Sequence, residues 1–163
     1  MKKAVKQILI LFFSALFIFG SANAVFALST ADAKEPIDVS KPCSLTLTYA
    51  IDGKKIEGLE IEAFLAASVT ADFQYSMTGA FSAYSIEING IRSQTEWDEV
   101  KDTVTAYIAA DKIAPTDTQT TDKNGVVKFE NLPVGIYYVR WTGNESVDPV
   151  YGFVPFLIAV PGL

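Results

Sequence analysis

The segment from residue 44 to residue 51 alternates strictly between apolar and small polar side chains. Successive side chains of a β-strand point to opposite faces, so a period of two predicts a strand with one buried face. The predicted buried face carries Leu45, Leu47, Tyr49 and Ile51. The Asp52-Gly53 pair that follows is typical of a hairpin turn, because both residue types tolerate a positive φ.

Further short strands follow this hairpin signal. Residues 56–66 predict a second strand, and residues 81–88 predict another that closes at Asn89-Gly90. The two faces of the second strand carry the apolar residues Ile61, Ala63 and Leu65 and the charged residues Glu60 and Glu62. The charged row indicates a face in contact with solvent.

The period changes from two to about 3.6 between residues 93 and 110, which predicts one inserted α-helix over about 95–110. Its apolar stripe holds Trp97, Val100, Val104, Tyr107 and Ile108. Ser93 followed by Glu96 is a capping-box pattern, and the helix should end before Ala114-Pro115. Residues 116–121 are polar and are interpreted as a linker.

The segment 121–139 predicts strand, tight loop and strand in succession. Asn124-Gly125 supplies a turn, residues 126–129 are β-branched and aromatic, and Pro133 with Gly135 breaks the chain before residues 136–141 resume as a strand. A last apolar strand is predicted over 150–160, where Pro155 indicates an edge or a bulge. Several short strands and one helix favour an antiparallel β-sandwich.

The N-terminus has the pattern of a secretory signal peptide over residues 1–27. A basic start precedes an apolar run over residues 8–19, and small residues permit cleavage after Ala24 or Ala27. An uncleaved anchor is the alternative, because residues 8–27 match the roughly 20 residues that span a bilayer. Residues 28–43 are polar and predict a disordered leader, which leaves residues 44–163 as a single domain.

Charge and composition narrow the function classes. Removal of residues 1–27 takes three lysines from the 13 basic residues and leaves all 19 acidic ones, a net charge of about −9. This balance argues against nucleic acid as a partner and, after cleavage, against membrane binding. Cys43 is the single cysteine, so no intrachain disulfide forms. We interpret it as a half-buried small residue, with a lipid or an intermolecular bridge as the alternative.

The chain has no histidine, which excludes the commonest general base and histidine-based triads and metal sites. A glycosidase-type carboxylate pair could come from Glu57, Glu60, Glu62 and Glu87, but such spacing on strands is typical of surface charge. Asp122 to Gly125 lacks the ligand spacing of a calcium loop. We therefore predict no enzyme, no catalytic residue, no metal site and no cofactor.

Exposed aromatic side chains are the remaining candidates for ligand contact. We name Trp97, Tyr107 and Tyr138, near the helix insertion. The alternative is that they belong to the core. Alternation places Tyr137 and Tyr138 on opposite faces of their strand, so one of the two faces is expected to be core.

The spacing Thr121-Asp122-x-x-Gly125-x-Val127-x-Phe129-x-x-Leu132-x-x-Gly135-x-Tyr137-x-Val139 resembles the B-type repeat domains of Gram-positive collagen adhesins and pilins (Cna B-type). Residues 81–115 and 151–161 are similar to segments of clostridial pilin-like N-terminal domains, so the likeness covers roughly 44–161. It implies an immunoglobulin-like or prealbumin-like (transthyretin-like) antiparallel sandwich, secreted or held at the cell surface.

The chain departs from this family where the family forms a Lys–Asn or Lys–Asp isopeptide bond. Trp141 stands where the family has the assisting acid, the first predicted strand has no lysine and the last has no asparagine. We therefore expect no isopeptide bond. A pilin-motif lysine and a sorting signal are also missing, so we expect no sortase signal, either in a stand-alone domain or in a truncated pilin.

Two functions remain open. The first is a non-catalytic structural or adhesive pilin-like surface domain, whose partners are other surface or pilus proteins or a host matrix or glycan ligand. The second is a soluble extracellular module that binds a glycan or a host protein.

Overall fold

The computed structural model describes residues 36–143 and 153–162. The predicted signal peptide with its cleavage positions, the leader up to residue 35 and the loop at 144–152 lie outside the described residues. Within the described part, β-strands dominate and every strand pairing is antiparallel. The elements in chain order are β1 (Cys43–Thr48), β2 (Ala50–Ile51), β3 (Lys54–Lys55), β4 (Glu60–Val69), β5 (Tyr75–Met77), η1 (Gly79–Ala83), α1 (Gln94–Asp111), β6 (Asp117–Thr120), β7 (Val126–Leu132), β8 (Gly135–Trp141) and β9 (Phe156–Val160).

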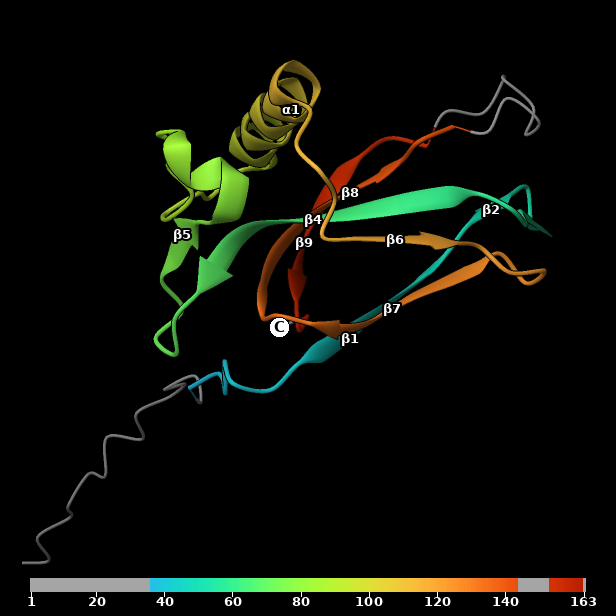
Figure 1. Cartoon of the computed structure of the whole chain (residues 1–163), viewed down its shortest axis with the longest axis horizontal. Helices are drawn as coiled ribbons and strands as arrows, with labels where there is room; N and C mark the ends of the chain where they lie inside the picture. The colour runs from blue at the N-terminus through green and yellow to red at the C-terminus, as the bar shows by residue number, and fades with distance from the viewer. Residues whose placement is uncertain (1–35, 144–152, 163) are drawn as a thin grey trace, which may run out of the picture. The chain divides into compact units, whose positions relative to one another are not determined.

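The predicted mainly β fold with one inserted helix is confirmed. The larger sheet has the order β5-β4-β8-β9, with β6 paired to a second stretch of β4. β1 and β7 form a separate two-stranded sheet, and β2 and β3 form a hairpin. Figure 1 shows α1 and the β1–β7 pair on opposite sides of β4. The larger sheet is thus the middle layer between a helix and a second sheet.

One face of β4 and β8 packs against β1 and β7, as the period-two pattern predicts. The core on this side gathers Leu45, Tyr49, Leu59, Ile61, Ala63, Val127, Phe129, Leu132, Tyr137, Val139 and Val160, all buried. The predicted apolar face of β1 supplies Leu45 to this core, and Leu47 packs against it. At about 25 cal/mol for each Å² of apolar surface removed from water, such burial is the main stabilising contribution.

The opposite face of β4 and β8 is also buried, which corrects the expectation that only one set of β8 side chains is core. Tyr137 is 0% exposed on one face and Tyr138 is 1% exposed on the other. The second core contains Phe64, Ala66, Phe81, Val100, Val104, Ile108 and Tyr138. The physical reason is the inserted helix, whose apolar stripe covers a face that is solvated in a simple two-sheet sandwich.

The predicted solvated row of β4 is only partly exposed. Glu60 is exposed, but the Glu62 side chain is 15% exposed, and its Oε2 accepts a hydrogen bond from Nε of Arg140 at 2.7 Å. The Arg140 guanidinium also lies 5.1 Å from the centre of the Phe64 ring. Glu62 is therefore a paired charge at the border of the helix-covered core, where it needs a cationic partner.

The helix boundaries follow the predicted signals. Ser93 is the N-cap, its hydroxyl oxygen accepts from the Glu96 N–H, and the Glu96 carboxylate accepts from the Ser93 N–H, which completes the capping box. The helix ends where Lys112 adopts a left-handed conformation with φ of 51°. This end lies before Ala114-Pro115, as predicted.

The predicted strand over 81–88 is wrong. Residues 79–83 form the 3-10 turn η1, and the chain then runs irregularly to Asn89. Phe81 and Ile88 are buried, so the apolar pattern does mark core residues. They anchor a loop against α1 and the sheet, and no strand edge is available for them to pair with along β4, which β5 and β6 already occupy.

Residues 116–121 are not a linker, since β6 pairs with β4 over Asp117 to Thr120. The side chains of β6 are mostly exposed, so the sequence shows no hydrophobic alternation from which this strand could be predicted. The first strand is divided at Tyr49 into β1 and β2, and the second begins at Glu60 and not at residue 56. The last strand is predicted over 150–160. Within its described residues, 153–160, the strand begins at Phe156, directly after Pro155.

The segment 121–139 crosses between the sheets. β7 pairs with β1, whereas β8 pairs with β4 and β9, and only Pro133 and Val134 lie between them. Asp122 organises the preceding turn, because its Oδ1 accepts from the N–H groups of Asn124 (2.8 Å) and Val126 (2.9 Å). These bonds, led by that from Val126, lower the pKa of Asp122.

Two glycines of this segment are required by close backbone contacts. A Cβ on Gly125, at φ of 69°, would lie 2.3 Å from the carbonyl oxygen of Tyr49. A Cβ on Gly135 would lie 2.3 Å from the carbonyl oxygen of Ala67 and 2.8 Å from Cδ1 of Leu65, where the pairing of β4 with β8 shifts register. Both contacts involve backbone that cannot rotate away.

We predict that Gly135→Ala destabilises the protein by about 1–3 kcal/mol, because the added methyl group must displace β4 from β8. Urea unfolding measures the loss. Gly162→Ala is the matched control, since a Cβ there meets nothing within 4 Å. Equal stability of the two variants would show that β4 yields without cost.

Candidate functional site

The three aromatic candidates for ligand contact have separate environments. Trp97, on α1, is half-buried and packs against the cluster of Ala67, Ile88 and Ile136. It also lines a cavity of about 270 Å³ between α1 and the chain that enters β9. The cavity walls are Gln94, Trp97, Asp98, Lys101, Val154, Pro155, Phe156 and Leu157. Trp97 is therefore the candidate that borders open space.

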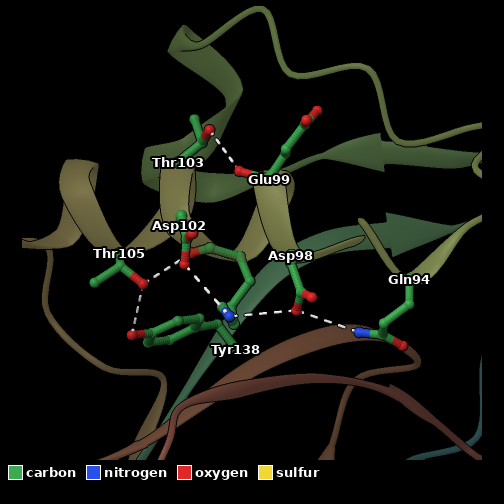
Figure 2. A network of polar contacts seen from close by, with 8 residues as sticks. Gln94, Asp98, Glu99, Asp102, Thr103, Thr105 and Tyr138 are labelled. Atoms are coloured by element: carbon green, nitrogen blue, oxygen red, sulfur yellow. Dashed lines mark hydrogen bonds and ion pairs between the residues drawn. The ribbon is translucent and has the colours of Figure 1, made fainter. Parts of the chain in front are cut away.

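Tyr138 lies under the helix, and its ring is only 1% exposed. Figure 2 shows its hydroxyl beside the hydroxyl of Thr105, at 2.9 Å. The Thr105 hydroxyl donates to the carbonyl of Lys101 at 2.8 Å, which leaves its lone pairs to accept from Tyr138. The phenol group thus ties β8 to α1, and its ring packs edge-on against Phe64.

Tyr107 faces a different neighbour. Its ring stacks on Tyr84 with centroids 3.5 Å apart and an interplanar angle of 12°. The Tyr84 hydroxyl donates to the Asp111 carboxylate, and this bond, with the burial and charges around it, raises the pKa of Tyr84 to about 12. The stacked pair fastens the chain after η1 to the last turns of α1.

A charged cluster on α1 lies next to the Trp97 cavity. The Lys101 ammonium is 3.3 Å from Asp98 and 3.4 Å from Asp102, and Gln94 donates to Asp98 (Figure 2). The Lys101 side chain is 18% exposed, and the bond to Asp98, opposed by desolvation, raises its pKa. Both carboxylates favour the protonated ammonium, which has no lone pair to act as a nucleophile.

Two of the four glutamates considered for a carboxylate pair accept hydrogen bonds from nearby groups. Glu60 accepts from the hydroxyl of Thr142 at 2.7 Å, and Glu87 accepts from the Asn89 N–H at 3.0 Å. A groove of about 360 Å³ between residues 85–91 and α1 is lined in part by Glu87, Glu96 and Glu99. Within residues 36–143 and 153–162, no group of three acidic or cysteine side chains is placed to hold a metal ion.

Trp141 occupies the position at which the resembling family carries an acid. Trp141, on β8, pairs with Ile61 of β4. Its ring meets the Phe153 ring edge-on, with the ring centroids 6.2 Å apart. Its indole N–H is buried without a hydrogen-bond partner among the described residues. An indole group donates only and takes up no proton from a neighbour, so it cannot do the work of a buried carboxylic acid.

Cys43 is half-buried at the start of β1 and lies opposite Leu132. Its thiol is 3.8 Å from the carbonyl oxygen of Lys41. Among the described residues, no helix is long and apolar enough to cross a membrane.

Comparison with known protein families finds no match, and no curated protein matches the chain. Comparison with solved structures returns pilins of Gram-positive bacteria. The full-length major pilin SpaD of Corynebacterium diphtheriae has a TM-score of 0.48 and 19% identity over 79% of this chain and 27% of its own. The pilus backbone protein RrgB of Streptococcus pneumoniae has a TM-score of 0.37 and 16% identity over 72% of this chain and 34% of its own.

The SpaA pilin of Corynebacterium diphtheriae, solved in complex with a signal peptide, has a TM-score of 0.34 and 21% identity over 74% of this chain and 84% of its own. The chain thus spans about a quarter of the SpaD pilin and about a third of RrgB.

The capping box at the start of α1 should make the stability of the protein depend on pH. Bonds from the N–H of Arg92 and from Ser93 lower the pKa of Glu96 in the folded state below its unfolded value. The stabilisation is therefore present above the unfolded pKa of about 4.5 and is lost as pH falls through the folded pKa. We predict that Glu96→Gln flattens this part of the stability profile in urea unfolding between about pH 7 and pH 3.

Glu99→Gln removes the same charge from the exposed side of α1 and serves as the control. An identical pH profile for both variants would show that the cap contributes nothing specific.

Proposed function

We propose that this chain is a secreted or cell-surface domain of the Cna B-type, pilin-like class, with a structural or adhesive role and no catalytic activity. The observation that carries the proposal is the geometry of residues 121–139. The spaced residues that resemble the family are the ones this fold requires: Gly125 and Gly135 allow close backbone contacts, and the Tyr137 hydroxyl donates to the carbonyl of Pro133 at 2.8 Å.

The chemistry of the described residues supports a role without catalysis. The chain has no histidine, Lys101 holds its proton between two carboxylates, and Glu62 is bound to Arg140. None of these groups is free to act as a nucleophile or a general base toward a bound substrate. We therefore propose that the domain acts through binding at its surface. The proposed partners are other surface or pilus proteins, or a host matrix or glycan ligand.

The proposal includes export, with cleavage after Ala24 or Ala27. It also includes a leader that tethers the domain, which the sequence predicts over residues 28–43 and which ends where β1 begins at Cys43. Fractionation of the bacterium that produces the protein tests it. The protein is expected in the cell-wall or culture fraction with its N-terminus at Val25 or Leu28. Retention in the cytoplasm would refute the surface role, and an intact Met1 on exported protein would favour the uncleaved anchor.

We further propose that the domain contains no isopeptide bond. β1 carries no lysine, β9 carries no asparagine, and Trp141 provides no acid. The mass of the exported protein should therefore equal that of its mature sequence. A mass lower by about 17 Da, the ammonia lost when a lysine amine joins an asparagine side chain, would contradict this prediction.

A second candidate function is binding of a glycan or a host protein through Trp97. The observation in its favour is that Trp97 is half-buried at the wall of a cavity. Tyr107 and Tyr138 are the other proposed contacts, although Tyr138 can present little more than its hydroxyl because its ring is covered.

If this second function holds, Trp97→Ala should abolish binding on a glycan array or in pull-down with host matrix proteins. Trp97→Phe, which keeps an aromatic face, should retain part of it, since one stacking contact is worth about 0.5–1.5 kcal/mol. Circular dichroism must show that both variants are folded. Binding unchanged in Trp97→Ala would remove Trp97 from the site.

A further inference from the structure

The strand β9 is an edge of the larger sheet. Its pairing with β8 runs from Val139 opposite Phe156 to Gly135 opposite Val160. On its other side, no strand from the described part of the chain is hydrogen-bonded to it. An extended strand directs alternate N–H and C=O groups to each side, so the outer edge of β9 presents backbone groups that no strand of residues 36–143 and 153–162 pairs with.

The residues of β9 itself give this edge none of the usual protection. Exposed edges of monomeric proteins commonly carry lysine or another charge that prevents a further strand from adding. All five residues of β9 are uncharged and apolar. The first four are half-buried, and only Val160 is buried, against the core shared with β1. The accessible part of the edge is therefore its N-terminal part, which begins at Phe156.

The Trp97 cavity opens at this same end of β9. Phe156 and Leu157 contribute to its wall, together with Val154. Val154 is 74% exposed, more than Val39, the other large apolar residue exposed in the described part of the chain. At about 270 Å³, the cavity is smaller than the roughly 300–1,000 Å³ of pockets that enclose small-molecule ligands. Its size suits a single apolar side chain.

The charge around the cavity is negative. α1 carries five acidic residues and one lysine. Asp98, in the cavity wall, and Asp102 share the single ammonium of Lys101, so one negative charge remains uncompensated. A basic side chain would complement this surface. A second copy of the same acidic chain would not, which argues against self-association here.

We propose that the outer edge of β9 and the Trp97 cavity together form a strand-accepting site, which binds an extended segment of another protein. The segment adds to the sheet beside β9, places one apolar side chain in the cavity and directs a lysine or arginine toward Asp98. Backbone bonds supply affinity and the cavity supplies selectivity, as in other cases of strand addition. This inference goes beyond the proposed surface role and does not require it.

Synthetic peptides and amide hydrogen exchange test the site. The probe is an eight-residue peptide of alternating valine and threonine with a central leucine and a lysine at each end. It should slow the exchange of outward-facing amides within Phe156–Val160. A matched peptide N-methylated at alternate amides should bind about tenfold more weakly, because it loses one or two strand bonds. No change in β9 exchange with the first peptide would overturn the proposal.

Variants separate the two recognition elements. Val154→Lys places a charge at the cavity mouth on an already exposed position and should weaken the peptide about tenfold. The control is Val39→Lys, at the other exposed valine, before β1, which should leave affinity unchanged. Asp98→Asn should weaken the lysine-ended peptide by about twofold to fivefold and leave a neutral-ended peptide unaffected.

Equal effects of Val154→Lys and Val39→Lys would overturn the proposal. So would concentration-dependent dimerisation that Val154→Lys abolishes, since the occupant would then be a second copy of this chain. Either result would leave the export and mass predictions untouched, so failure of this site and failure of the surface role are distinguishable.

Discussion

The burial of β4 and β8 on both faces is the constraint on which the rest of the fold depends. Ile61 and Tyr137 face the β1–β7 sheet, while Phe64 and Tyr138 face α1. A sheet with two apolar faces is stable in water only when both are covered, so the helix insertion is a structural necessity. The hydrogen bond between Thr105 and Tyr138 then ties the helix to the strand beneath it, and the capping box at Ser93 fixes where the helix begins. Surface that remains for recognition lies at the margins of this arrangement.

The spaced residues of the segment 121–139 meet geometric requirements of the fold. Gly135 permits the contact with Ala67 at the register shift of β4, and the Tyr137 hydroxyl closes the turn onto Pro133. These requirements belong to any chain that passes between two packed sheets in this way. Trp141, just beyond this segment, pairs with Ile61 of β4 and packs against Phe153, so its side chain serves packing and supplies no acid.

Hydrophobic patterning predicts the elements that have one buried face and one solvent-exposed face. The alternation of β1, the stripe and cap of α1 and the glycine turns of residues 121–139 all lie close to where the sequence places them. The strand β6 is missed because backbone hydrogen bonds to β4 hold it in place and its side chains are polar on both faces. Residues 81–88 are misread because buried Phe81 and Ile88 anchor a loop with the spacing of a strand. Of the Trp97 cavity, the sequence predicts only the aromatic residue, since Val154 and Phe156 reach its wall from a segment remote in sequence.

The short crossing from β7 to β8 has a mechanical consequence. β1 begins opposite Leu132 and β9 ends opposite Gly135, so the first and last strands of the sandwich are both anchored beside Pro133 and Val134. Tension that separates the start of β1 from the end of β9 acts first on the ladder bonds next to this link. It would open them in succession and not load them all in parallel. Resistance to pulling at this link then depends on the packing around Phe129 and Tyr137.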